Sequence, residues 1–123
     1  MSKILISIKP KYVDLILSGS KKYEYRKIQA QKNIDKLIIY ATYPIKKVVA
    51  EVEVLEVFKD TPKNIWKKTN KFAWVNKNTY YSYFKNNTLA VAYQLGKIIK
   101  YDKEKELKEY NIKNAPQSFV YID

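Results

Sequence analysis

The sequence contains no histidine and no cysteine among its 123 residues. These two absences exclude disulfide bridges, zinc sites built on thiolate or imidazole ligands, thiol nucleophiles and any catalysis that depends on an imidazole base. Chemistry in this chain must therefore use lysine, carboxylate, hydroxyl, tyrosine or backbone groups, and we expect no bound metal.

Glycine is also scarce, because the chain holds only Gly19 and Gly96. A P-loop and a dinucleotide-binding fingerprint each need several glycines at fixed spacing, so neither is present and we expect no cofactor. The apolar stretch at residues 4–8 is too short for a signal peptide or a membrane span. From these absences we predict a cytoplasmic protein that does not contact a membrane.

The length of the chain and its apolar content, 46% of residues, provide for one hydrophobic core and not for two. The sequence shows no internal repeat and no linker. We therefore predict that residues 1–123 form a single domain, whose oligomeric state the sequence leaves open.

Positive charge is in excess and unevenly spread. The chain has 24 basic and 12 acidic residues, a net charge of +12, and Arg26 is the only arginine. Residues 61–100 carry eight lysines and no acid, and 12 tyrosines are interleaved along the chain. Cations mixed with flat rings are typical of surfaces that bind phosphates and stack on bases. An AT-rich genome produces the same composition without any nucleic-acid partner, so both interpretations stay open at this point.

Hydrophobic periodicity and turn residues predict strands at residues 4–8, 23–26, 35–42, 46–58 and 88–101 and near the C-terminus, with helices at 10–18, 62–69 and near 78–86. Gly19 is expected to end the first helix in a left-handed conformation. The phase of the long strand slips at Leu55, which indicates a β-bulge after which Leu55 and Val57 face inward. We expect Trp66 and Trp74 to be core residues or hydrophobic staples and not platforms for bases, and we expect a solvated helix or turn at residues 102–110. This pattern predicts a small, barrel-like α+β domain.

One stretch concentrates groups that can carry chemistry, since Gly19, Lys21, Glu24 and Arg26 fall within eight residues. The pattern Gly-x-Lys-x-x-x-x-Arg, directly after a short helix that follows a Ser-Ile-Lys-Pro strand end, resembles the ASCH domains of the PUA-like superfamily. The resemblance continues through residues 37–44, the long strand at 48–58 and the Pro-Gln-Ser-Phe sequence at 116–119. It covers essentially the whole chain in the expected order.

The resemblance implies a PUA-like β-barrel of about five to six strands with two to three flanking helices. It also implies a cleft between the first helix and the barrel, where related domains hold RNA or a modified base. Members of the family are thought to be RNA-binding modules or transcription co-regulators, and some are amidases on acylated cytidine nucleosides or ribonucleases. The amidases use a threonine nucleophile where this chain has Glu24, and a carboxylate does not simply replace a hydroxyl nucleophile.

Elementary chemistry assigns each motif residue a role. The planar guanidinium of Arg26 suits a phosphate, Lys21 adds a point charge at the cleft mouth, and Glu24 accepts from an exocyclic amine or acts as a base. The alternatives are a surface ion pair between Glu24 and Arg26, and a Lys21 that only complements the helix dipole. The candidate ligand-binding residues are Ser7, Lys9, Gly19, Lys21, Glu24, Arg26, Tyr40, Thr42, Gln117 and Ser118.

The sequence favours a module that binds RNA, or a modified nucleoside or nucleotide, and that acts as a transcription or translation co-regulator. The alternative is a small hydrolase, either an amidase on acylated cytidine nucleosides or a ribonuclease, with Lys21 and Glu24 as its catalytic groups. A third possibility is a protein-interaction module with an exposed apolar surface around Trp66, Trp74 and residues 80–84.

Overall fold

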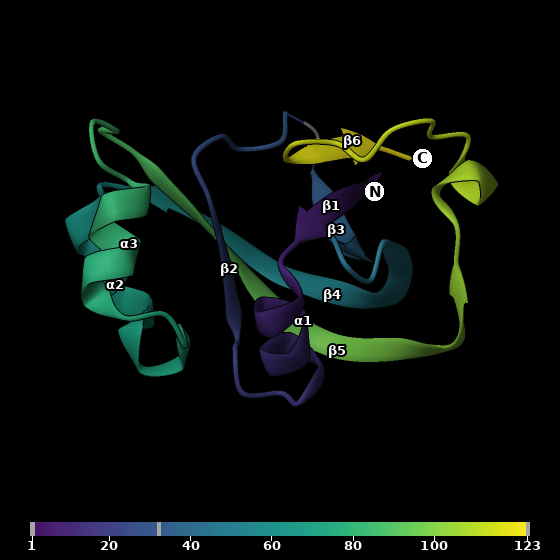
Figure 1. The fold of residues 1–123 in the computed structure, drawn as a ribbon. Helices are drawn as coiled ribbons and strands as arrows, with labels where there is room; N and C mark the ends of the chain where they lie inside the picture. The colour runs from purple at the N-terminus through teal and green to yellow at the C-terminus, as the bar shows by residue number, and fades with distance from the viewer. Residues whose placement is uncertain (1, 32, 123) are drawn as a thin grey trace.

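A computed structural model describes residues 2–31 and 33–122, and its core is one curled, six-stranded sheet with the strand order β2-β5-β4-β3-β1-β6 (Figure 1). Strands β1 and β3 are parallel and all other neighbours are antiparallel. The predicted α+β, barrel-like class is confirmed. The strands are β1 (Ser2–Ile8), β2 (Tyr23–Arg26), β3 (Ile34–Ala41), β4 (Lys47–Asp60), β5 (Ala90–Lys105) and β6 (Phe119–Tyr121).

Three short α-helices and two 3-10 turns flank the sheet. They are α1 (Pro10–Leu17), α2 (Pro62–Thr69), η1 (Asn70–Phe72), α3 (Lys77–Tyr83) and η2 (Leu107–Tyr110). Proline stands in the first turn of α1 and of α2, where its missing N–H has no helical partner to lose. None of the helices in the described ranges is long and apolar enough to cross a membrane.

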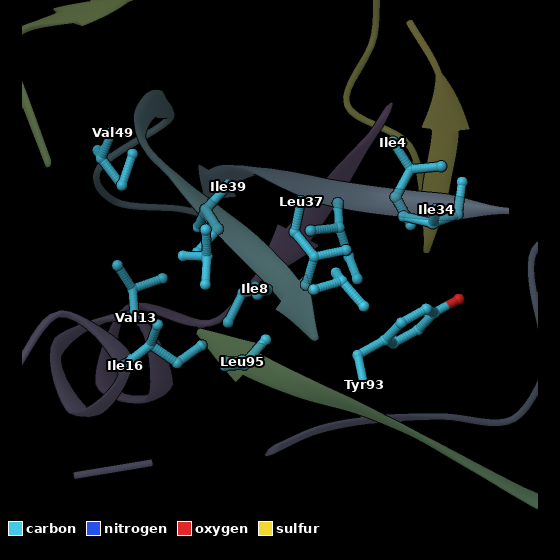
Figure 2. Close-up of a cluster of buried hydrophobic side chains, with 14 of the residues drawn as sticks. Ile4, Ile8, Val13, Ile16, Ile34, Leu37, Ile39, Val49, Tyr93 and Leu95 are labelled. Carbon is cyan, nitrogen blue, oxygen red and sulfur yellow. The ribbon is translucent and has the colours of Figure 1, made fainter. Parts of the chain in front are cut away.

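The inner face of the curled sheet packs against α1. The alternating apolar residues of β1 and β3, such as Ile4 and Leu37, point into this core, as Figure 2 shows. Val13 and Ile16, one helical turn apart on α1, close it from one side. This packing fixes the position of α1 against the first strand.

The opposite face of the sheet has two separate covers. At one end α2 and α3 pack on Tyr25 of β2 and on Ala90 and Ala92 of β5. At the other end the segment from Tyr101 to residue 122 packs on Leu5 and neighbouring apolar residues of β3 and β4. The sheet is therefore buried on both faces over much of its area, although the chain is short.

Two expectations about the long strands were wrong in part. Of the helix or turn expected at residues 102–110, only η2 at Leu107–Tyr110 is present, because strand β5 continues to Lys105, where β4 pairs with it as far as Val48 opposite Lys105. Partner hydrogen bonds outweigh the charge-rich local pattern there. The predicted bulge exists, with a register shift between Val54 and Glu56, but Leu55 is 57% exposed and lies over Gly96 instead of facing inward.

The expectation that both tryptophans are core residues or hydrophobic staples was wrong for one of them. Trp66 is half-buried against Tyr80, with ring centroids 4.6 Å apart. Trp74 is 54% exposed, because it occupies the turn between η1 and α3 with a left-handed φ of 53°. A backbone turn at this point directs the residue away from the apolar clusters on either side of it.

Gly19 ends α1 as predicted, with φ at 83°. Its N–H donates to the carbonyl of Ile16, and the N–H groups of Ser20 and Lys21 both donate to the carbonyl of Leu15. These bonds form a Schellman-type ending, which reverses the chain and brings it directly into the motif that carries Lys21.

We predict that Gly19→Ala lowers the free energy of unfolding by about 1 kcal/mol, because a side chain makes the left-handed conformation costly. Gly19→Asn should lose less, since asparagine tolerates this conformation. Urea unfolding followed by circular dichroism measures both variants. Equal stability of Gly19→Ala and the wild type would contradict this account of the turn.

Candidate functional site

A cavity of about 620 Å³ opens where α1, the ends of β1 and β2, the turn after β3, α3 and the segment before β6 meet. Eight of the ten candidate residues line it, from four separate parts of the chain. They are Ser7, Lys9, Lys21, Glu24, Arg26, Tyr40, Thr42 and Gln117. Gly19 and Ser118 do not line it.

Lys21 is buried in the cavity wall, with 3% of its surface exposed. Its Nζ donates a hydrogen bond of 2.7 Å to the carbonyl of Ala73 and lies 5.2 Å and 5.0 Å from the ring centroids of Tyr12 and Tyr25. Burial lowers the pKa of this ammonium group below its ordinary value. Lys21 is thus bound by the η1 to α3 turn and by two rings, and does not merely complement the dipole of α1.

Glu24 and Arg26 form an ion pair whose side chains are only 8% and 11% exposed. The Nε and Nη2 groups of Arg26 donate to the same oxygen, Glu24 Oε2, at 3.1 Å and 2.8 Å. The alternative of a surface ion pair, considered from sequence, does not describe this buried arrangement. Partnered burial is the condition under which two charges persist at low exposure.

Arg26 also connects β2 to the other edge of the sheet. Its Nη2 donates to the carbonyl of Ser7 at 2.7 Å, and its Nη1 lies 3.4 Å from Ser118 Oγ. The Nε and Nη2 donors are therefore directed at protein atoms. The expected fork for a phosphate is reduced to the Nη1 group, which has only one long contact.

The segment that precedes β6 is held against the cavity by Ser7. The hydroxyl of Ser7 donates to the carbonyl of Pro116 at 2.7 Å, and its N–H donates to the carbonyl of Ser118 at 3.0 Å. These bonds place Gln117, an exposed residue, in the cavity wall. Ser118 supports this wall through Arg26 and does not itself line it.

Sequence reasoning missed most of the aromatic part of the wall, since it named only Tyr40. Several tyrosines reach the cavity from α1, β2, the turn after β3, and α3, and these are Tyr12, Tyr25, Tyr43, Tyr80 and Tyr83. Burial raises the pKa of Tyr25 to about 12, so its phenol stays neutral. The only sequence signal for this wall was the high tyrosine count, because the residues are too far apart in sequence to form a motif.

The charges of the wall favour an anionic ligand. Four cationic side chains, Lys9, Lys21, Arg26 and Lys46, line the cavity together with a single carboxylate, Glu24. No cluster of three or more potential metal ligands occurs in residues 2–31 and 33–122. Rings, cations and one carboxylate suit a ligand that combines a flat ring, N–H donors and negative charge.

Comparisons with known proteins agree on one family. A family model described as the ASCH domain matches residues 6–115. The crystal structure of a tyrosine-to-phenylalanine mutant of the ASCH protein from Zymomonas mobilis is similar to this chain with a TM-score of 0.90 and 21% sequence identity. The similarity covers 100% of this chain and 91% of that one. At this identity the structural likeness shows the fold.

Three relatives are similar in sequence. An ASCH domain-containing ribonuclease of Zymomonas mobilis is 27% identical over 92 residues, which cover 74% of this chain and 62% of that protein. Two Ureaplasma parvum proteins match 97% of this chain: large ribosomal subunit protein uL22 at 30% identity and ATP synthase subunit alpha at 27%. The chain spans only 39% and 15% of their lengths. Each of these two matches is therefore confined to a part of a longer protein.

We predict that Arg26→Met lowers the free energy of unfolding by about 3 to 5 kcal/mol, because it leaves the Glu24 carboxylate buried without its partner. The matched control is Lys36→Met, which breaks an ion pair of 3.1 Å to Glu51 with the lysine 41% exposed, and this should cost less than about 1 kcal/mol.

Adding Glu24→Gln to Arg26→Met should restore part of the lost stability, because the unpaired buried charge is then removed. Denaturant unfolding of the single and double variants measures the coupling. Similar losses for Arg26→Met and Lys36→Met would refute the structural role given to the buried pair.

Proposed function

This chain belongs to the ASCH domain family, and we propose that it is an RNA-binding module that holds one nucleotide of the RNA in the cavity between α1 and the barrel. The observation that carries this proposal is the composition of the cavity wall, which combines four cations, six tyrosines and one carboxylate. A volume of about 620 Å³ lies within the usual range for small-ligand sites.

In this proposal the ligand makes three kinds of contact. The flat face of the base stacks on the tyrosine rings, close to the cationic side chains of the wall. Glu24 accepts from an N–H group of the base through Oε1, since Arg26 bonds only to Oε2. The exposed Lys9 and Lys46 at the mouth attract the phosphates.

The role of Arg26 differs from a simple phosphate clamp. Its bonds to Glu24 and Ser7 make it a positioning residue that fixes the carboxylate, while its Nη1 group remains the one part of the fork able to reach a phosphate. Tyr40 and Thr42 extend the wall on the β3 side. A modified nucleoside or nucleotide makes the same contacts, and its affinity is the one to compare with that of RNA.

We also propose a cellular location and a role for this RNA-binding module. The expected location is the cytoplasm, and the expected role is that of a transcription or translation co-regulator, with residues 1–123 acting as one domain. The net charge of +12 supports this role by adding affinity that does not depend on RNA sequence.

We predict that affinity for a fluorescein-labelled single-stranded RNA falls steeply between about 50 and 200 mM salt, because phosphate contacts release counterions. Lys9→Met, at the cavity, should weaken binding by about tenfold, whereas Lys108→Met, an exposed lysine on η2 outside the cavity, should change it by less than about twofold.

Fluorescence anisotropy measures these affinities. Both lysines are exposed, so neither substitution disturbs the core. Salt-independent affinity, or equal binding by the two variants, would contradict the proposal.

A ribonuclease is the second candidate, favoured by the buried Lys21 with its lowered pKa and by the relative named a ribonuclease. In such a reaction Glu24 accepts the proton of a 2′-hydroxyl, and the 2′-oxygen forms a bond to phosphorus as the bond to the 5′-oxygen breaks. Lys21 donates a proton to the departing 5′-oxygen, and a lowered pKa makes it a stronger acid. The products are a 2′,3′-cyclic phosphate and a 5′-hydroxyl.

The amidase alternative has less support. Glu24 stands where the amidases of the family carry their nucleophilic threonine, and one of its oxygens is bound to Arg26. A carboxylate in this state is oriented to accept hydrogen bonds.

We predict that, if the chain cleaves RNA, Lys21→Met and Glu24→Gln each lower the rate by at least about 100-fold, and that a 2′-deoxy substitution blocks cleavage at that nucleotide. End-labelled RNA resolved on a sequencing gel reports the products, and acylated cytidine tested in parallel reports amidase activity. The absence of turnover on both substrates leaves binding as the function, while cleavage that survives both substitutions excludes this pair of catalytic groups.

A further inference from the structure

Trp74 stands in the turn between η1 and α3, which forms part of the cavity rim through Val75. The residue before it, Ala73, is fully buried and accepts the hydrogen bond from Lys21 Nζ, and the residue after it, Val75, lines the cavity. The N–H of Lys22 also donates to the carbonyl of Phe72 at 3.0 Å. The turn that carries Trp74 is thus tied at two points to the segment that carries the motif lysine.

Two features of Trp74 contribute nothing to the stability of the fold. It adopts a φ of 53°, which strains a residue with a side chain and which glycine or asparagine adopts at lower cost. It is also 54% exposed, and within the described ranges no aromatic or cation contact involves its ring. A large ring held in a strained and exposed position indicates a functional constraint.

The surroundings of Trp74 are basic and aromatic. Phe72, two residues earlier, is 46% exposed, and the Nζ of Lys22 lies 5.7 Å from its ring centroid. Lys71 and Lys77 are exposed on the two sides of the turn. Residues 61–100, which include the turn, contain no acidic side chain, so their electrostatic field favours a polyanion.

We propose that an RNA strand continues from the cavity across this rim, with the base next to the bound nucleotide stacked on Trp74. The ligand is then a single-stranded oligonucleotide, and a free nucleoside makes only part of the contacts. This inference rests on the proposed function and narrows its ligand class. An exposed indole stacks on any base, so the contact adds affinity with little sequence preference.

The test uses Trp74 as its own reporter. In a Trp66→Phe background, Trp74 is the only tryptophan, and the half-buried position 66 accepts the smaller ring. We expect an oligouridylate of about six nucleotides to quench the emission of Trp74 on binding, because a stacked base contacts the indole directly. Uridine monophosphate at saturating concentration should leave that emission largely unchanged.

A second measurement removes the ring. Trp74→Gly relieves the strained φ, so it should fold at least as stably as the wild type. We expect this variant to bind the oligonucleotide about tenfold more weakly and the mononucleotide equally well, and Trp74→Phe to retain most of the affinity. Lys71→Met should reduce oligonucleotide affinity more than Lys108→Met, which lies on η2.

The outcomes separate this inference from the proposed function. Unchanged oligonucleotide affinity in Trp74→Gly, or unquenched Trp74 emission at saturation, overturns the stacking platform while RNA binding at the cavity stands. If a DNA or protein ligand quenches Trp74 and no RNA does so, the stacking platform for RNA is likewise overturned. Failure of both oligonucleotide and mononucleotide to bind overturns the proposed function together with the inference.

Discussion

The buried guanidinium of Arg26 is the interaction on which the architecture of the site depends. The sheet is an open strip whose edge strands are β2 and β6, and Arg26 extends from β2 to Ser7 on β1 and to Ser118 just before β6. A polar side chain thus bridges a gap that backbone hydrogen bonds do not close. Glu24 neutralises the charge, so the guanidinium stays buried at this position.

The same hydrogen bonds close the barrel and form one side of the cavity. The bonds from Ser7 and Arg26 that fix the segment before β6 also place Pro116 and Gln117 in the cavity wall. On the other side, the bond from Lys21 to Ala73 joins the first motif to the turn before α3. Two charged side chains from one short motif therefore position two sides of the site, and both remain partnered by protein atoms.

Much of the fold was predictable because its signals are local. Alternation in β1, the proline at the start of α1 and the left-handed Gly19 each depend on a few neighbouring residues. The predictions were wrong where contacts between distant segments determine the local structure. Pairing with β4 extends β5 through a charged stretch, and the bulge near Leu55 directs that side chain over Gly96. Trp74 is exposed because of a turn that the composition of its neighbours does not reveal.

By itself, the sequence determined the family, the motif residues Lys21, Glu24 and Arg26, and the exclusion of thiol and imidazole chemistry. These properties follow from residue identity and short spacing. Only the tertiary structure decided that the three charges are buried, that Arg26 is directed mainly at protein atoms, and that six tyrosines line the cavity. Burial and hydrogen-bond partners arise from contacts between residues far apart in the chain, and short-range sequence patterns carry no record of those contacts.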